Sequence, residues 1–106
     1  KLSKPDFRYV YAMENQDRKR IKIGMATNPE KRLQDLQTGN DQKLSLVHVE
    51  PVAYKDAPKV EVLARDIAKS KGKPKTREWI SKTTAEEAKY FIQTAHEIVR
   101  GKNSPS

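Results

Sequence analysis

Two short segments near the beginning of the chain alternate apolar side chains with other residues, and this period of two constrains the fold more than any other feature. In the first segment, residues 7–13, aromatic and other apolar residues fall at every second position. In the second, residues 20–24, Ile21 and Ile23 alternate with polar residues. Such alternation predicts two strands. Because a short polar stretch around residues 14–17 connects them, an antiparallel hairpin is the simplest way to join the two strands.

The signals for a helix follow directly after this hairpin. Thr27 or Asn28 can supply the N-terminal cap, since both side chains accept hydrogen bonds from backbone amides. Pro29 suits the first helical position, and the body of the helix is predicted over residues 30–37. Gly39 is typical of the residue that ends a helix.

The remaining elements are predicted from the same rules of spacing and capping. A strand is predicted from the apolar residues at 44–49 and ends at Pro51 or soon after, and a helix opens at Ala57 and Pro58. Trp79 and Ile80 form a short apolar strand or turn anchor. The last helix begins at Thr83 or Thr84, where Glu87 completes a capping box, and ends at Gly101. The order β-β-α-β-α-(β)-α indicates an α+β fold with a small three-stranded antiparallel sheet flanked by helices. We expect residues 1–6 to form a polar lead-in, residues 7–101 one domain, and residues 102–106 a flexible tail.

The charge of the chain favours a polyanionic partner. There are 22 lysines and arginines against 14 acidic residues, so the formal net charge is +8 and the pI is about 9.8. Such a field attracts nucleic acid through phosphate neutralisation and counterion release. A membrane surface ranks below nucleic acid, because no basic amphipathic helix with bulky apolar residues is present. Basic residues at every second position predict a phosphate-binding rail along an extended loop, and they are Lys69, Lys71, Lys73, Lys75 and Arg77.

Several classes of protein are excluded by what the sequence does not contain. The chain has no cysteine, which excludes a disulfide scaffold, a thiolate zinc site and a cysteine nucleophile. Its 4 scattered glycines cannot form a phosphate-binding glycine loop, and no apolar run reaches membrane-spanning length. His48 and His96 lie far apart without partners in a recognised catalytic spacing. We therefore interpret His48 as a packed or surface residue of a strand and His96 as a residue of the helix surface.

A set of short motifs gives the sequence its most specific signal. The motifs are Tyr-Val-Tyr at 9–11, Lys-Ile-Gly at 22–24, Asn-Pro-Glu-Lys-Arg at 28–32, Leu-Gln-Thr-Gly at 36–39 and Arg-Glu-Trp at 77–79. In this order and spacing, over roughly residues 8–80, the chain resembles the GIY-YIG nuclease superfamily, in particular its phage and bacterial subgroup with a KIG motif. In this resemblance Tyr9, Gly24 and Trp79 are structural positions of the motifs, and Tyr9 stands where the family has the first glycine of GIY.

The resemblance also implies a set of site residues. Tyr11 matches the tyrosine that orients or deprotonates the attacking water, and Arg32 matches the arginine that neutralises the scissile phosphate. Glu61 matches the glutamate that binds the single divalent metal, Mg²⁺ or Mn²⁺. Lys22 replaces the tyrosine of YIG and is a candidate to hold a phosphate or a water. Arg65 stands at a position often occupied by histidine, which favours a further contact with phosphate.

The resemblance implies a metal-dependent endonuclease that hydrolyses DNA phosphodiester bonds, with RNA as an open alternative substrate. Two other functions remain open: a catalytically inactive nucleic-acid-binding module, favoured by Lys22, and a regulatory module that binds another protein. Because domains of this family usually choose sites poorly alone, the resemblance leaves three alternatives open: a homodimer, an attached specificity domain, or a nuclease of low specificity. Glu78 is a weaker candidate for a metal ligand. The expected location is the cytoplasm of a bacterial or phage-infected cell, or the nucleus of a eukaryotic one.

Overall fold

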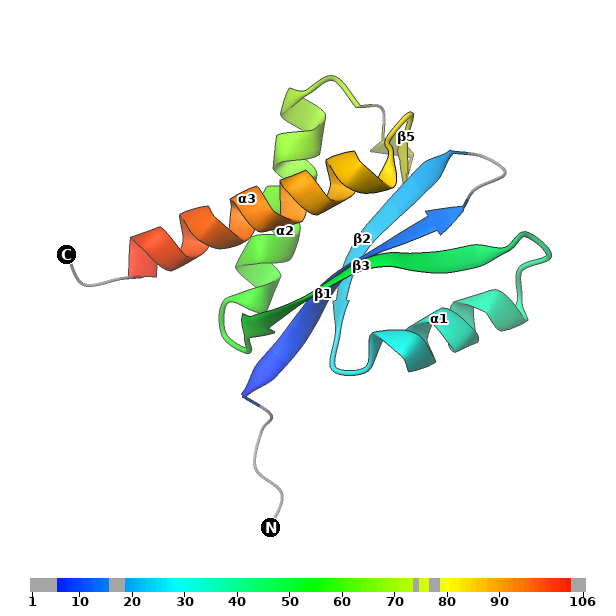
Figure 1. Ribbon diagram of the computed structural model, residues 1–106, viewed down its shortest axis with the longest axis horizontal. Coiled ribbons are helices and arrows are strands. Elements are labelled where there is room, and N and C mark those ends of the chain that lie inside the picture. The colour runs from blue at the N-terminus through cyan, green and yellow to red at the C-terminus, as the bar shows by residue number, and fades with distance from the viewer. Residues whose placement is uncertain (1–5, 16–18, 74, 77–78, 104–106) are drawn as a thin grey trace, which may run out of the picture.

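The computed structural model describes residues 6–15, 19–73, 75–76 and 79–103 of the chain (Figure 1). In chain order the elements are β1 (Phe7–Asn15), β2 (Arg20–Ala26), α1 (Pro29–Thr38), β3 (Leu44–Ala53), α2 (Ala57–Ser70), β4 (Lys75–Thr76), β5 (Trp79–Ser81) and α3 (Ala85–Asn103). None of the helices in this described part combines the length and the apolar character that a membrane crossing needs.

The strands form one antiparallel sheet in the order β3-β1-β2-β5-β4. The predicted α+β class is therefore confirmed. The predicted number of strands is too small, since the described residues contain five strands rather than three. Of the two additional strands, β5 falls on the predicted short apolar strand or turn anchor at Trp79 and Ile80. β4 is not predicted, because a segment of 2 residues cannot show an alternating pattern.

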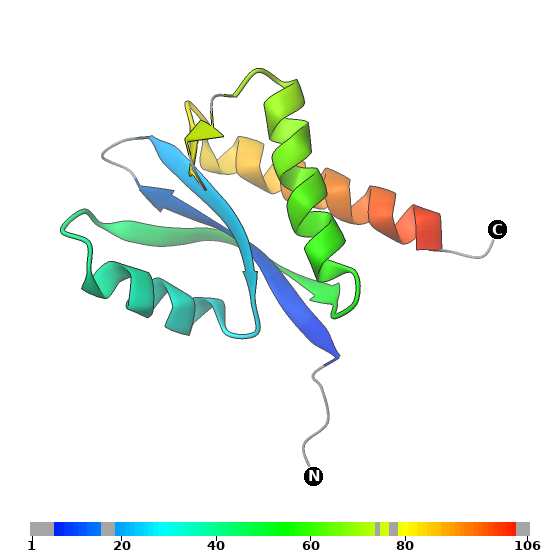
Figure 2. The same cartoon turned by 180° about the vertical axis from the view of Figure 1, so that it is seen from behind.

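The two faces of the sheet are covered by different helices, as Figures 1 and 2 show. Val10 and Ala12 of β1, together with Ile21 and Ile23 of β2, belong to the core cluster that also contains the buried residues of α2 and α3. Because successive side chains of a strand point to opposite faces, Tyr11 lies on the other face, which is the side of α1. This face holds the candidate site.

β3 ends at Ala53, soon after Pro51 as predicted, and an edge strand tolerates Pro51 because its missing amide hydrogen is not needed for pairing on the outer side. Two helix ends differ from the predicted ones. α2 continues to Ser70, so Lys69 is helical and is not part of a loop. α3 passes Gly101 and ends at Asn103, and residues 104–106 of the predicted tail lie outside the described residues.

The predicted caps are confirmed by their hydrogen bonds. The Lys31 amide donates to Asn28 Oδ1 at 3.1 Å, and Pro29 occupies the first turn of α1. At the beginning of α3, the Glu87 amide donates to Thr84 Oγ1 at 3.1 Å and the Thr84 amide donates to Glu87 Oε1 at 3.0 Å. This reciprocal pair is the predicted capping box, and it satisfies two backbone donors that the helix itself cannot satisfy.

A second polar contact holds α3 to the edge strand β3. One carboxylate oxygen of Glu50 lies 3.0 Å from His48 Nε2, and the other lies 2.5 Å from His96 Nδ1. All three side chains are largely buried. Because both imidazoles face the same carboxylate, the two histidines are part of the packing between strand and helix. This agrees with a packed role for His48, whereas the predicted helix-surface position of His96 is wrong.

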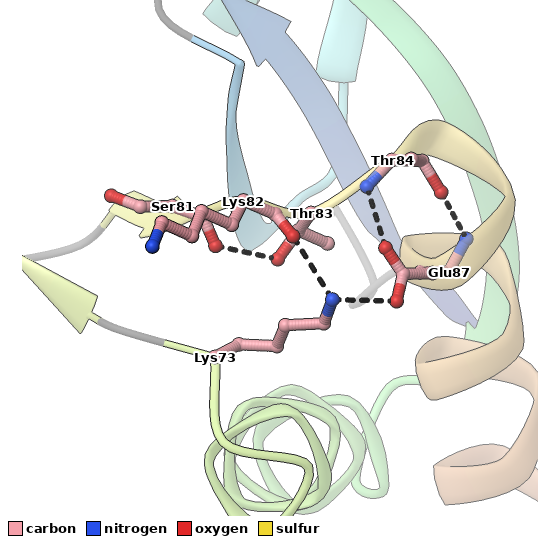
Figure 3. Close-up of polar contacts among 6 residues, drawn as sticks. All are labelled: Lys73, Ser81, Lys82, Thr83, Thr84 and Glu87. Carbon is pink, nitrogen blue, oxygen red and sulfur yellow. Dashed lines mark hydrogen bonds and ion pairs between the residues drawn. The ribbon is translucent and has the colours of Figure 1, made fainter.

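The beginning of α3 is also tied to the turn after α2. Lys73 Nζ donates to the backbone oxygen of Lys82 at 2.9 Å and lies 2.7 Å from Glu87 Oε2 (Figure 3). Thr83 Oγ1 donates to the Ser81 oxygen at 3.0 Å in the same region. Chiefly through the hydrogen bond from Lys73, and also through the Thr84 amide, the pKa of Glu87 is held below its ordinary value of 4.5.

This contact predicts a pH dependence of stability. A carboxylate whose pKa is lower in the folded than in the unfolded protein stabilises the fold above its unfolded pKa, and that stability is lost as the pH falls through the folded pKa. We therefore expect wild type to unfold at a higher temperature than Glu87→Gln at about pH 7, and the difference to disappear in acid below pH 4.5. Circular dichroism melts over this range test it. With the Glu87 side chain 38% exposed, the effect should not exceed about 1 kcal/mol.

Candidate active site

The ring of Tyr11 lies directly over Gly24. The two residues face each other across the β1–β2 pair, and Tyr11 is only 1% exposed. A Cβ atom built on Gly24 would stand 2.6 Å from the Tyr11 hydroxyl oxygen, closer than side chains tolerate. Gly24 is therefore the residue that leaves room for the Tyr11 ring and fixes where its hydroxyl lies. The sequence predicts both motif positions, and the structure supplies the steric reason that links them.

Lys22 lies beside Tyr11 on the same face of the sheet. It pairs with Met13 of β1 on one side and with Trp79 of β5 on the other, and it is 5% exposed. A buried ammonium group is costly unless it is paired, and Lys22, like Tyr11, has an interaction partner within the protein. A tyrosine hydroxyl and a lysine ammonium thus share one largely covered face next to α1.

Arg32 belongs to α1, the helix on the Tyr11 side of the sheet. Its backbone amide donates to the Asn28 oxygen at 3.1 Å, which places it in the first turn of the helix. The residue is exposed. An exposed guanidinium on this side can reach a phosphate that approaches from solvent.

Glu61 lies on α2, whose buried residues pack against the opposite face of the sheet from Tyr11. Its Oε1 accepts a hydrogen bond from Arg65 Nη2 at 3.2 Å. The predicted set is therefore carried by elements on both faces. β5 pairs with β2 only over residues 20–22, so groups from the two faces can approach each other around the edge of β2 near Gly24. A site that includes both Tyr11 and Glu61 must lie at this edge.

The described residues offer a limited donor set for a metal ion. Among them there is no group of three or more histidine or acidic side chains close enough to hold one. Mg²⁺ needs less than such a cage, because it keeps most of its waters and is often bound through one or two carboxylates and the phosphates of the substrate. Glu61 fits this mode as a single carboxylate. Glu78, the weaker candidate, lies outside the described residues.

The basic rail is not one extended loop, so that part of the prediction is wrong. Lys69 lies in the last turn of α2, and Lys73 is engaged with Glu87 and the Lys82 backbone. Lys71 follows the helix and is exposed. Lys75 lies in β4, Arg77 lies outside the described residues, and Arg65 is paired with Glu61. Of these residues, Lys69 and Lys71 present exposed positions at the end of α2.

Sequence reasoning missed a hollow beside Tyr11. It measures about 370 Å³ and is lined by Tyr9, Thr27, Asn28, Pro29, Glu30 and Val49. Val49 stands opposite Tyr11 in the β1–β3 pair, so the hollow adjoins the tyrosine. Nothing in the local sequence pattern brings β3 and the beginning of α1 together, and the hollow follows from tertiary packing alone.

The fold and the site define the class of the protein: a small α+β domain that carries a buried tyrosine and lysine on one face of an antiparallel sheet. The family model of the T5orf172 domain matches residues 7–99, which is most of the chain. The protein therefore belongs to the T5orf172 domain family, a nuclease-associated domain, and its role is nuclease-like or DNA-binding. Comparisons with curated proteins and with solved structures found no match.

The close approach of Gly24 and Tyr11 predicts the effect of adding one methyl group. Gly24→Ala should displace the Tyr11 ring and cost about 1–3 kcal/mol of unfolding free energy through overpacking. Gly39→Ala is the matched control, because nothing lies within 4 Å of a Cβ at Gly39 and its φ of −97° suits any residue. Urea unfolding of the two variants measures the difference. Equal stability of both variants would contradict the steric role of Gly24.

The exposure of Lys71 predicts a role in binding DNA. Lys71→Gln should weaken binding and reduce the slope of log affinity against log salt concentration by about 1, because one phosphate contact is lost. Lys43→Gln removes the same charge from an exposed position before β3 and serves as the control. Fluorescence anisotropy with a labelled duplex at several salt concentrations gives both slopes. Identical slopes would remove Lys71 from the DNA-binding surface.

Proposed function

We propose that this T5orf172 domain is a GIY-YIG-type endonuclease that hydrolyses phosphodiester bonds of DNA. The observation that carries the proposal is the position of the Tyr11 hydroxyl, held over Gly24 and beside the buried Lys22 on one face of the sheet. Gly24 leaves room for the ring and fixes where the hydroxyl lies, and a fixed position is what a group that orients a reactant needs. The family match and the net charge of +8 support DNA as the partner.

In the proposed reaction the residues have separate tasks. The Tyr11 hydroxyl orients the attacking water and exchanges a proton with it. Lys22 holds a non-bridging oxygen of the scissile phosphate as a point charge, and Arg32 grips the same phosphate from α1 through its planar guanidinium. Both cations counter the negative charge that grows on the phosphate during attack, which is the main requirement of phosphoryl transfer.

The proposed cofactor is Mg²⁺ or Mn²⁺, held by Glu61 and by waters. When bound, such an ion stabilises the developing charge on the phosphate and on the leaving oxygen. The hard oxygen ligand that the Glu61 carboxylate offers on α2 is what supports this assignment. The hydrogen bond from Arg65 orients the Glu61 carboxylate and leaves Oε2 outside that contact.

A second candidate function is DNA binding without cleavage. It is favoured by one observation: a lysine occupies the buried position where the GIY-YIG family has its second tyrosine. Lysine holds phosphate but supplies no phenolic oxygen. In this alternative the same face of the sheet binds the backbone of DNA, and Tyr11 has only a packing role.

Nicking of supercoiled plasmid decides between the two functions. Wild type should nick with Mg²⁺ or Mn²⁺ and stop in EDTA, and Tyr11→Phe should reduce the rate at least about 100-fold, since only a proton-transfer group is lost. Glu61→Gln keeps the contact with Arg65 and should raise the metal concentration needed for half-maximal nicking. Tyr90→Phe, which removes a hydroxyl from a 53% exposed tyrosine of α3, is the matched control.

Each outcome of this experiment assigns a role. If Tyr11→Phe nicks as fast as wild type, the Tyr11 face is not the catalytic site. If wild type binds the plasmid in a salt-dependent manner but never nicks it with either metal, the second candidate function is correct.

A further inference from the structure

The hollow beside Tyr11 has a floor that the fold leaves partly uncovered. Tyr9 is two residues from Tyr11 on the same face of β1, and Val49 stands opposite Tyr11 on β3. Val49 is 40% exposed, which is unusual for a large apolar residue on a sheet face that a helix partly covers. Pro29 at the beginning of α1 closes one wall. An aromatic ring, a branched side chain and a proline ring thus form an open apolar surface next to the proposed catalytic hydroxyl.

The rim of the hollow is polar. Thr27 and Glu30 contribute a hydroxyl and a carboxylate, and both residues are exposed. Asn28 also lines the hollow, but its Oδ1 already accepts the Lys31 amide as the helix cap. The hydrogen bonding that a ligand can use at this rim therefore comes mainly from Thr27 and Glu30.

This combination matches a nucleobase better than a phosphate. A base has a flat π-face that stacks on an aromatic ring regardless of its identity, and an edge that carries hydrogen-bond donors. A phosphate in the hollow would face the Glu30 carboxylate and be repelled by it. The volume of about 370 Å³ lies in the range of small-ligand sites.

Glu30 adds a chemical preference among bases. A carboxylate accepts hydrogen bonds and donates none, so it pairs with the exocyclic amino group that cytosine, adenine and guanine carry. Thymine has an oxygen in place of that amino group, and only its ring N3–H can donate. The rim therefore favours bases with an amino group over thymine.

We propose that the hollow formed by Tyr9, Val49 and Glu30 binds one unstacked, amino-bearing nucleobase next to the phosphate at Tyr11. Two residues along a strand span about 6.6 Å, which places Tyr9 roughly one nucleotide from the scissile position. A base can enter the hollow only when it has left its duplex partner, so the substrate class is single-stranded or locally unpaired DNA. This inference rests on the proposed function in that it takes Tyr11 to face the scissile phosphate.

Binding of short labelled oligonucleotides in EDTA tests the inference without any cleavage. Fluorescence anisotropy compares homopolymers of dC, dA and dT. Wild type should bind dC and dA more tightly than dT, and Tyr9→Ala should weaken the binding of all three at least about fivefold, because a stacking contact is lost. Tyr9→Phe keeps the ring and should bind as wild type does. Tyr90→Ala removes an exposed tyrosine from α3 and is the control for a general loss of aromatic surface.

The base preference is tested by a separate variant. Glu30→Met removes the acceptor with little change in size and should bring the affinities for dC and dT together. Glu86→Met removes an acidic residue from the first turn of α3 and controls for the added positive charge and for the effect on a helix end. Val49→Gln fills the floor at an exposed position and should weaken binding even if Tyr9→Ala does not fold.

The outcomes separate this inference from the proposed function. One outcome would overturn the base-binding hollow and leave the proposed function standing. In that outcome wild type nicks plasmid, but Tyr9→Ala and Val49→Gln bind oligonucleotides no worse than Tyr90→Ala does. Equal affinity of wild type for dC, dA and dT would overturn the role of Glu30. Failure of wild type to bind DNA in any form would overturn both the inference and the proposed function.

Discussion

The structure depends on a central strand that is buried on both faces and paired on both edges. β1 lies between β3 and β2, and Val10, Tyr11, Ala12 and Met13 are all essentially inaccessible to solvent. Successive residues of this run serve opposite faces, so a slip of one residue would move Tyr11 into the core and Ala12 into the site. Gly24 favours the observed register, because a Cβ at this position would stand 2.6 Å from the Tyr11 hydroxyl oxygen and the glycine leaves that space open. The register that defines the fold is thus the same constraint that positions the candidate site.

The core on the α2 and α3 side is built largely from small residues. The core cluster there includes Ala57, Ala64, Ala68, Ala88 and Ala95. Small side chains let the two helices approach each other and the sheet closely, but each buries little apolar area. In a chain with only 35% hydrophobic residues, polar contacts become a larger share of what fixes α3. Glu50 with His96 secures its middle against β3, and Glu87 with Lys73 secures its beginning.

The sequence predicts those parts of the structure whose cause is local. Asn28 and Thr84 are found as helix caps because capping depends on residues within one turn, and the strand pair is found because Ile21 and Ile23 alternate. What is missed depends on distant residues. The short β4 exists only because it pairs with β5, and the choice between strand and turn at Trp79 and Ile80 is decided by the pairing of β5 with β2. The engagement of Lys73 with Glu87 joins positions that no local pattern relates.

In the candidate site, too, the features with a local cause are predicted and those that depend on distant residues are not. Tyr11 and Gly24 are predicted as motif positions, but their contact, and the presence of Lys22 on the same face, require the register of the sheet. Glu61 is predicted from a resemblance of motifs, while the face on which its helix packs is a tertiary property. A motif therefore identifies candidate residues, and only the packing of α1 and α2 on opposite faces decides how they meet.

The two faces of the sheet also differ in how well they tolerate amino-acid substitutions. On the α2 and α3 side, each buried residue contacts neighbours from several elements, so a substitution must preserve volume. On the α1 side, Val49 and the rim at Thr27 and Glu30 remain open to solvent. A tyrosine at position 9, where the GIY motif has glycine, is tolerated here because its ring extends into this open hollow and not into the core. Variation of substrate preference within such a domain is therefore expected on the α1 face, around a Tyr11 that the register holds in place.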